Sequence, residues 1–367
     1  MKKEIGGKRK PLGAVKKTPS MGELKREDLI AVLKRLKPGL GTGKLGADYD
    51  SNFLFRTDRL GSYNDDVAIQ CSFPVGVECS VDGEKLLTAL AKVYSERLAM
   101  SVDAEKGQLV IKAGRQSFGL MVNAESEELS KRLDTFNYEN MEWKETPKGL
   151  REGLRFCSYS ASKDATKPYL MGVFVEGRDL LSSDNYRISW YTLGKSLTEN
   201  AVLIPAREYL KISDYPCEKY AVDDAWIHFM GEGLYYSLHL LGLAEEYPAN
   251  SAKGFVPKKV DASKQFTIPK SFSKALDNSL VIDKDKSFWD REVKIFSREG
   301  TLYCRSEAEV GDWYEESIEF PAKVSNFSVA LNPAFLSDIL KYECKAYLVD
   351  EHKILFMSDS FRHLISF

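Results

Sequence analysis

Residue patterns that commonly carry catalysis or bind metals are incomplete in this chain. The segment GLGTGKL at residues 39–45 resembles a phosphate-binding loop, but Pro38 stands where the first glycine belongs and Leu45 replaces the Ser or Thr that would hold magnesium. The four histidines lack paired-ligand spacing, and no GxSxG motif occurs. Adjacent acids such as Asp223 and Asp224 fall in predicted turns, where solvated charges need no catalytic role. We therefore predict no enzyme, no metal site and no cofactor.

Cysteine usage and hydropathy predict that the protein resides in a reducing aqueous compartment. The six cysteines are scattered without a CxxC pair, which argues against a zinc ribbon or a disulfide framework. No run of 18 apolar residues occurs, and the first residues are charged rather than an apolar signal core. The predicted location is therefore a reducing cytoplasm, with no membrane partner.

Charge is distributed unevenly along the chain. The formal net charge is −2, yet residues 1–20 carry seven Lys and Arg against the single acid Glu4, with Gly and Pro interspersed. This composition predicts a flexible basic arm, which either contacts nucleic acid or is only a solvated end. The remaining chain is acidic, so any DNA contact requires basic groups concentrated on one surface.

The elements that must position such groups recur three times. A short apolar strand, a helix and paired strands repeat at intervals of about 120 to 130 residues, which indicates one module used three times. Asp82 is the predicted N-cap of one of these helices. Two polar segments, 123–141 and 245–257, are predicted to be linkers. Helices covering one face of an antiparallel sheet make the fold class α+β. The predicted helices span residues 23–37, 82–94, 148–162, 205–212, 269–282 and 333–342.

The second repeat contains the most specific motif. Residues 167–193 read KPYLMGVFVEGRDLLSSDNYRISWYTL, and they are followed by VLIPAREYLKI, EYPANSAKGFVP and NPAFLSDILKY. In order and spacing these segments resemble landmarks of the bacterial DNA polymerase III β subunit, the β sliding clamp family. Asn185-Tyr186 replaces the family's Gly-His, and the chain end lacks its Met-Pro-Met. Such departures are typical of a divergent member, for example a phage- or plasmid-encoded one.

The resemblance implies a fold and a function. The implied fold has three clamp domains at 21–128, 129–252 and 253–367, each with two helices on antiparallel sheet, and two copies close into a six-domain ring. The implied function is a DNA sliding clamp, a processivity factor that encircles duplex DNA without reading its sequence and tethers a replicative polymerase. A clamp loader and a second copy of the chain are the other implied partners.

The resemblance also implies three sets of site residues. A hydrophobic groove for partner peptides would contain Leu170, Ser183, Asn185, Tyr186, Arg187, Ile188, Pro248, Phe255, Val256, His363, Leu364 and Ile365. DNA contacts would come from Lys34, Arg35, Lys44, Lys148, Arg151, Arg155, Lys163, Lys167, Tyr169, Arg207, Lys211 and Lys274. The dimer interface would contain Arg115, Phe118, Leu120, Leu280, Val281, Glu307 and Glu309. An alternative is a monomeric binding or scaffold protein that has the clamp fold and does not encircle DNA.

Overall fold

The computed structural model describes residues 23–41, 50–123, 126–282, 286–308, 310–320 and 326–366. The predicted arm at 1–20, Lys44 and Glu309 lie outside the described residues. The chain forms two compact units, Met1–Trp143 with His228–Ser237, and Lys144–Ile227 with Leu238–Phe367.

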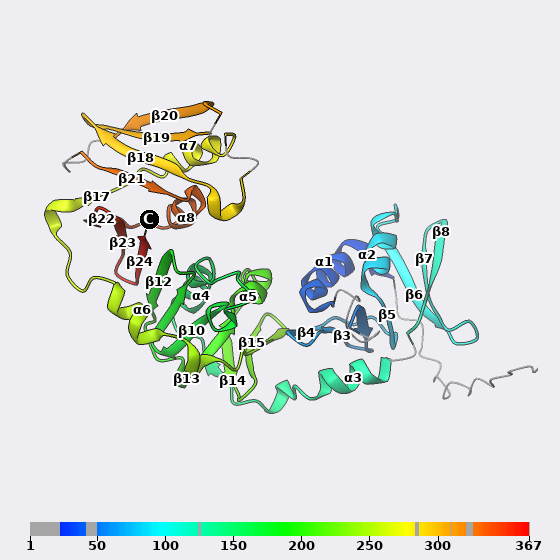
Figure 1. The fold of residues 1–367 in the computed structure, drawn as a ribbon. Coiled ribbons are helices and arrows are strands. Elements are labelled where there is room, and N and C mark those ends of the chain that lie inside the picture. The colour runs from blue at the N-terminus through cyan, green and yellow to red at the C-terminus, as the bar shows by residue number, and fades with distance from the viewer. Residues whose placement is uncertain are drawn as a thin grey trace, which may run out of the picture. The chain divides into compact units, whose positions relative to one another are not determined.

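The same order of elements occurs three times along the described chain (Figure 1). Each repeat consists of a short strand, a helix, four strands, a second helix and three strands. We refer to residues 24–121, 144–239 and 265–366 as the first, second and third modules. The predicted α+β fold of three repeated modules is therefore confirmed.

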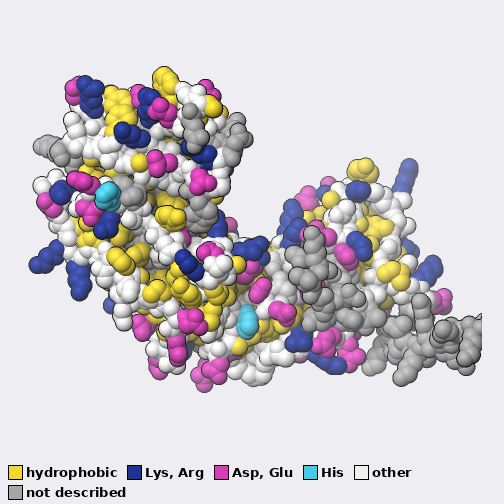
Figure 2. All heavy atoms as spheres, viewed as in Figure 1, with side chains coloured by type: hydrophobic (Ala, Val, Ile, Leu, Met, Phe, Trp, Pro, Cys, Tyr) yellow, Lys and Arg dark blue, Asp and Glu magenta, His cyan; other side chains and the backbone are white. Residues whose placement is uncertain are grey.

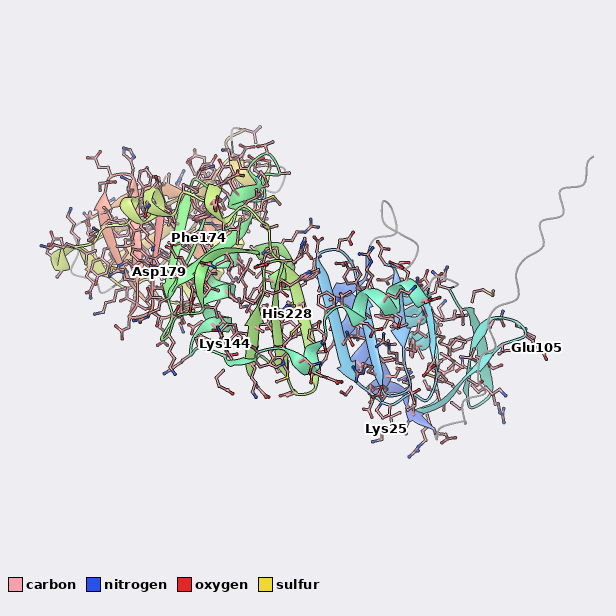
Figure 3. The ribbon with its side chains drawn as sticks, turned by 90° about the horizontal axis from the view of Figure 1, so that it is seen from below. Lys25, Glu105, Lys144, Phe174, Asp179 and His228 are labelled. Atoms are coloured by element: carbon pink, nitrogen blue, oxygen red, sulfur yellow. The ribbon has the colours of Figure 1, made fainter. Side chains whose placement is uncertain are left out.

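The first module buries an apolar stripe of its first helix, which the sequence predicts at residues 23–37. Leu29, Leu33 and Leu36 on α1 are fully buried. Asp82 caps α2, because its carboxylate accepts a hydrogen bond from the Lys85 N–H at 2.8 Å. Glu105 lies in the turn between β6 and β7 (Figure 3). The elements are β1 Leu24–Lys25, α1 Arg26–Leu36, β2 Asn52–Phe55, β3 Arg59–Tyr63, β4 Val67–Ser72, β5 Cys79–Asp82, α2 Gly83–Ala91, β6 Arg97–Asp103, β7 Gln108–Ala113 and β8 Gln116–Met121.

The second module places the helix α4 against α5. The helix α4 begins later than predicted, because Gly149 adopts a left-handed φ of 88° at its N-cap. A Cβ atom at this position would lie 2.6 Å from the Tyr191 hydroxyl oxygen, which favours glycine sterically as well. The elements are β9 Lys144–Glu145, α4 Leu150–Ser158, β10 Gly172–Gly177, β11 Asp179–Ser183, β12 Arg187–Thr192, β13 Thr198–Pro205, α5 Ala206–Ile212, β14 Lys219–Val222, β15 Trp226–Gly231 and β16 Leu234–His239.

The third module joins the second through a shared sheet within the second unit. β12 pairs antiparallel with β24, with Arg187 opposite Ile365, and the eight strands run in the order β13-β10-β11-β12-β24-β23-β22-β17. Asn332 caps α8. The elements are β17 Gln265–Phe266, α7 Phe272–Ser279, β18 Val293–Arg298, β19 Thr301–Glu307, β20 Trp313–Glu319, β21 Ser328–Leu331, α8 Pro333–Ile339, β22 Lys345–Asp350, β23 Lys353–Met357 and β24 Phe361–Ser366.

The two predicted linkers do join successive modules, but each contains a helix. The first linker holds α3 Ser126–Asp134, and the second holds α6 Ala249–Phe255. Leu129 and Leu133, spaced i and i+4 on α3, are buried, while Glu–Lys and Glu–Arg pairs at the same spacing stabilise its exposed side. The prediction that both segments are plain linkers overlooked the i, i+4 spacing of these leucines. Among the described residues, no helix is long and apolar enough to cross a membrane.

Candidate binding sites

A cavity of about 370 Å³ lies in the second unit, between strands of the second module and the end of the third. Nine of the twelve predicted groove residues line it: Leu170, Ser183, Asn185, Tyr186, Arg187, Ile188, Pro248, Phe255 and Leu364. Nine residues that were predicted from separate motifs therefore lie around one cavity.

The turn between β11 and β12 shapes one wall of the cavity. The Asp184 carboxylate accepts hydrogen bonds from the backbone N–H groups of Tyr186 and Arg187, at 3.2 and 3.1 Å. Asn185 lies between Asp184 and Tyr186 and has a left-handed φ of 76°, a conformation that asparagine tolerates better than most residues. Asn185 can therefore stand where the clamp motif has glycine. Tyr186, which follows in the turn, is 51% exposed.

The opposite wall comes from α6. Ala252 on this helix is buried, whereas Phe255 is 64% exposed although it is a large apolar side chain. Tyr186 and Phe255 thus present apolar surface to solvent around a hollow whose inner walls, Leu170 and Leu364, are buried. An apolar hollow with a few polar groups at its rim is suited to hold hydrophobic side chains of an extended peptide.

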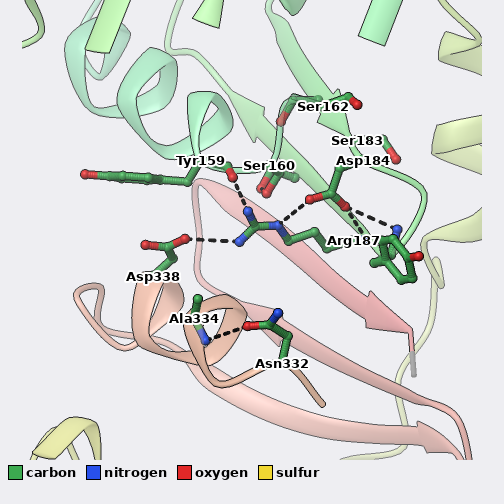
Figure 4. A network of polar contacts seen from close by, with 12 residues as sticks. Tyr159, Ser160, Ser162, Ser183, Asp184, Arg187, Asn332, Ala334 and Asp338 are labelled. Atoms are coloured by element: carbon green, nitrogen blue, oxygen red, sulfur yellow. Dashed lines mark hydrogen bonds and ion pairs between the residues drawn. The ribbon is translucent and has the colours of Figure 1, made fainter. Parts of the chain in front are cut away.

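Besides lining the cavity, Arg187 holds two parts of the structure together, a role that the sequence does not predict. Its guanidinium is 3% exposed and forms ion pairs with Asp184 at 3.0 Å and with Asp338 on α8 at 3.1 Å (Figure 4). It also donates a hydrogen bond to the Tyr159 carbonyl and packs 4.2 Å from the centre of the Phe335 ring. Two carboxylates neutralise this charge, so Arg187 ties the turn to the third module.

Burial and charge oppose each other at Asp184. Burial raises the pKa of its carboxyl group, because the charged form loses its hydration, and the neighbouring Arg187 guanidinium partly offsets this effect. The ionised carboxylate therefore depends on Arg187. Removal of either partner of this pair should therefore destabilise the structure, because the other charge would stay buried and unpaired.

Three predicted groove residues are buried and do not line the cavity. Val256, His363 and Ile365 belong to the core. Side chains alternate along β24, so Leu364 and Ser366 face the cavity while His363 and Ile365 face the other side of the sheet. A hydrogen bond of 2.8 Å joins the His363 Nδ1 to the Ser189 hydroxyl. Burial lowers the pKa of His363 to about 3.

Five lining residues were not predicted as groove residues: Tyr169, Ser251, Ala252, Lys353 and Ser366. Tyr169 was predicted to contact DNA, but its side chain packs beside the buried cluster of Leu170, Phe174 and Tyr247. The period-2 alternation of β24 could have identified Ser366, two residues after Leu364. Lys353 comes from β23, and nothing in its local sequence indicates the cavity.

The predicted DNA contacts lie mostly on the paired helices of the modules. Several have acidic neighbours: Arg155 pairs with Asp214 at 2.8 Å, and Lys211 pairs with Glu208. Lys163 instead stacks its ammonium 4.7 Å from the centre of the Phe288 ring. Exposed basic residues lie on or beside these helices in every module: Lys34 and Arg35 at α1, Lys148, Arg151, Arg207 and Lys211 at α4 and α5, and Lys274 at α7.

The predicted dimer contacts that the structure describes lie on or near two edge strands, β8 and β20. In the first unit, β8 ends the sheet β1-β6-β7-β8 and holds Phe118 and Leu120, with Arg115 in the turn before it. In the second unit, β20 ends the sheet β20-β19-β18-β21. Glu307 ends the neighbouring β19, and Leu280 and Val281 follow α7, which packs against β20.

Exposed apolar side chains gather at these features. Seven large hydrophobic residues are more than half exposed in the described chain. Tyr186 and Phe255 border the cavity, as described above. Met121 ends β8, and the backbone N–H of Tyr94 is bonded to Gln116 on the same strand. The remaining three are Val281, Val310 and Trp313, which lie beside or on β20. Clusters of exposed apolar surface indicate contact surfaces rather than scatter.

Comparison with solved structures identifies the architecture. The β subunit of DNA polymerase from Streptococcus pyogenes matches with a TM-score of 0.73 at 16% identity, over 94% of this chain and 98% of that chain. The DNA polymerase sliding clamp from Bacillus subtilis matches with a TM-score of 0.72 at 15% identity, over 94% and 97%. The Helicobacter pylori β clamp, solved with a bound DNA ligase peptide, matches with a TM-score of 0.70 at 15% identity, over 94% and 98%. The chain has the fold of the β sliding clamp.

The chain shares the clamp fold with these structures at only 15–16% sequence identity. No model of a protein family and no curated protein sequence matches the chain. The resemblance seen in short motifs is therefore supported by the fold over 94% of the chain rather than by overall sequence identity. No group of three or more His, Cys, Asp or Glu residues in the described ranges is arranged to hold a metal ion.

Proposed function

We propose that the chain is a non-enzymatic DNA sliding clamp that encircles duplex DNA and tethers a replicative polymerase. The observation that carries the proposal is the match of the clamp fold over 94% of the chain. The cavity between the second and third modules supports it, because nine residues chosen from clamp motifs line that cavity.

Ring closure in this proposal joins β8 of one copy to β20 of another. Each is a free edge of a four-stranded sheet, whereas β12 and β24 already unite the second and third modules in one eight-stranded sheet. Pairing the two edges would satisfy their backbone groups and cover exposed apolar residues such as Met121 and Trp313. Because the two edges differ, the contact is heterologous. Such a contact gives a closed ring of two copies only if each contact rotates one copy by half a turn relative to the other.

DNA would be held by topology and by weak phosphate contacts. Exposed Lys and Arg on the helix pairs attract phosphate without reading bases, and neighbouring acids such as Asp214 and Glu208 limit the strength of each contact. A clamp that slides needs contacts of this weak and salt-sensitive kind. The predicted contact Tyr169 is left out of this surface, because it lines the peptide cavity.

Partner proteins would insert a short hydrophobic segment into the cavity. The Helicobacter pylori clamp of the same fold was solved with a DNA ligase peptide bound. We propose peptide capture in the cavity of this chain, with Tyr186 and Phe255 as the exposed apolar contacts. A replicative polymerase and a clamp loader are the partners expected to compete for this site.

The mass of the protein in solution tests ring formation. A closed dimer has twice the chain mass of 41.5 kDa. Light scattering coupled to size exclusion, at micromolar concentration, should give this doubled mass. A strict monomer would favour the alternative of a scaffold protein that has the clamp fold and does not encircle DNA.

A further inference from the structure

The charged residues that line the cavity in the second unit are all basic. Among the described residues, no Asp or Glu lines it, whereas Arg187 and Lys353 do. Asp184 and Asp338 already neutralise the guanidinium of Arg187. The charge of Lys353 is therefore the one that can act on a molecule inside the cavity.

Lys353 has a single ion-pair partner in the described part of the chain. Its ammonium donates to the Asp350 carboxylate at 3.3 Å, and the two side chains are 36% and 45% exposed. Such an exposed pair contributes little, because water competes for both charges. The other oxygen of Asp350 accepts a hydrogen bond from the His352 backbone N–H at 2.8 Å, so the turn also holds this carboxylate. A carboxylate that enters the cavity can therefore take Lys353 from Asp350 at low cost.

The register of β23 and β24 places Lys353 at a defined distance from the apolar wall of the cavity. Ser366 on β24 is opposite Lys353, and Leu364 is opposite Leu355. Leu364 and Ser366 both line the cavity, and two residues on one face of a strand are about 7 Å apart. Alternate residues of an extended peptide have the same spacing and point to one side. A peptide that runs along β24 with an apolar side chain on Leu364 therefore brings the side chain two residues away to Lys353.

The rest of the cavity is apolar or neutral. Leu170 and Leu364 form its buried wall, and the exposed Phe255 lies at its rim at the end of α6. Figure 2 shows hydrophobic side chains at the surface in the region where Figure 1 places α6. The lining hydroxyl and amide groups, which carry no charge, belong to Ser183, Asn185, Ser251 and Ser366. An occupant thus meets an apolar wall and one cation at a fixed separation.

A neighbouring hollow of about 360 Å³ has the opposite charge balance. Three residues line both the cavity and this hollow: Asn185, Tyr186 and Ser366. The charged residues of the neighbouring hollow are two acids and one base: Asp290, Glu292 and Arg291. An acidic group is therefore favoured beside Lys353 and disfavoured in the neighbouring hollow. The position of an acid in a bound peptide, and not only its net charge, should decide the affinity.

We propose that Lys353 selects partner segments in which an acidic residue lies two positions from an apolar residue. The apolar side chain packs against Leu364, and the acidic side chain replaces Asp350 as the partner of Lys353. The proposal rests on peptide capture in the cavity, which is part of the proposed function. It adds the chemistry of the partner, which is an extended segment with apolar and acidic side chains at alternate positions.

Fluorescence anisotropy with matched peptides tests this selection. The parent probe is a fluorescein-labelled peptide with two leucines at alternate positions in a neutral background of glycine, serine and asparagine. It is amidated at its C-terminus, so that no terminal carboxylate contributes. Two further probes carry one aspartate, placed either two residues before the first leucine or two residues after the second. One of these acidic probes should bind at least about fivefold more tightly than the parent, and the other should not, because Lys353 lies to one side of Leu364.

Three variants assign the gain to Lys353. Lys353→Met should remove the difference between the favoured acidic probe and the parent. Asp350→Asn should enlarge this difference, because it frees Lys353 while the amide oxygen can still accept from the His352 N–H. Lys345→Met is a matched control, since Lys345 is an exposed lysine on β22 of the same sheet and does not line the cavity. It should leave the difference in place, and circular dichroism of each variant verifies folding.

The outcomes separate this proposal from the function on which it rests. Equal affinities of the three probes, an equal gain for both acidic probes, or a gain that survives Lys353→Met would overturn the selection by Lys353 and leave peptide capture standing. If no probe binds, or if Tyr186→Ala with Ile188→Ala does not weaken binding of the parent probe, peptide capture in the cavity is refuted, and the selection with it.

Discussion

Replacing Arg187 with methionine should destabilise the second unit strongly. Arg187 is 3% exposed and neutralises Asp184, whose carboxylate is 1% exposed. Methionine fills part of the space but leaves Asp184 buried without its counter-charge. Breaking a buried pair in this way costs about 3–5 kcal/mol. The loss of the ion pair to Asp338 is the smaller part, since that carboxylate is 22% exposed and can be solvated.

The pH dependence gives this prediction a distinctive sign. Burial already raises the pKa of Asp184, and removal of Arg187 should raise it further. A carboxyl group with a raised pKa binds its proton more tightly in the folded state, so stability is lost as pH rises above the pKa of the unfolded chain and regained as pH falls. The deficit of Arg187→Met should therefore shrink between pH 7 and pH 5.

Urea denaturation of the full chain, followed by fluorescence, measures the effect. The double variant Arg187→Met with Asp184→Asn should be more stable at pH 7 than Arg187→Met alone, because it removes the uncompensated charge. Arg132→Met is a matched control: its pair with Glu128 is exposed on α3 and should contribute only about 0.3–0.5 kcal/mol. A loss below about 1 kcal/mol for Arg187→Met, or no rescue by Asp184→Asn, would refute the role assigned to this network.

Three further predictions concern the groove, a buried histidine and DNA. Tyr186→Ala with Ile188→Ala should lower affinity for a polymerase-derived hydrophobic peptide by at least about tenfold in fluorescence anisotropy, with the dimer intact; unchanged affinity would contradict the assigned groove. The pKa of His363 is lowered by burial from 6.5 to about 3, so the free energy of unfolding should fall by about 1.4 kcal/mol for each pH unit below 6.5. His363→Asn should remove this pH dependence in urea titrations. Lys148→Ala with Arg207→Ala should reduce the slope of log affinity for DNA against log salt by about 1 to 2, whereas an unchanged slope would exclude these residues from the contact.

The repeated pattern of elements was predictable because it depends on local periodicity. The alternation of apolar residues and the cap at Asp82 determine where strands and helices form, and both were confirmed. Helix α3 was missed because its polar residues outnumber Leu129 and Leu133, the two residues that anchor it. Composition alone describes such a segment poorly, since two buried leucines at i and i+4 suffice to fix a short helix to a sheet.

The groove was predicted in part, for reasons of strand geometry and chain distance. Motif similarity located the turn at Asn185 and Tyr186. It also assigned three successive residues of β24 to the groove, although side chains alternate along a strand and His363 therefore points into the core. The partner of Arg187, Asp338, lies 151 residues further along the chain. No local pattern indicates so distant a contact, so the structural role of Arg187 emerged only from the fold.

Retention on circular DNA is the decisive test of whether the protein encircles the duplex. The protein, loaded onto nicked circular plasmid by a clamp loader, is separated from free protein by gel filtration at a salt concentration that suppresses phosphate contacts. The protein should stay with the circle and be lost when a single restriction cut linearises the DNA, because a ring slides off a free end. Equal retention on circular and linear DNA would contradict encirclement and indicate ordinary surface binding.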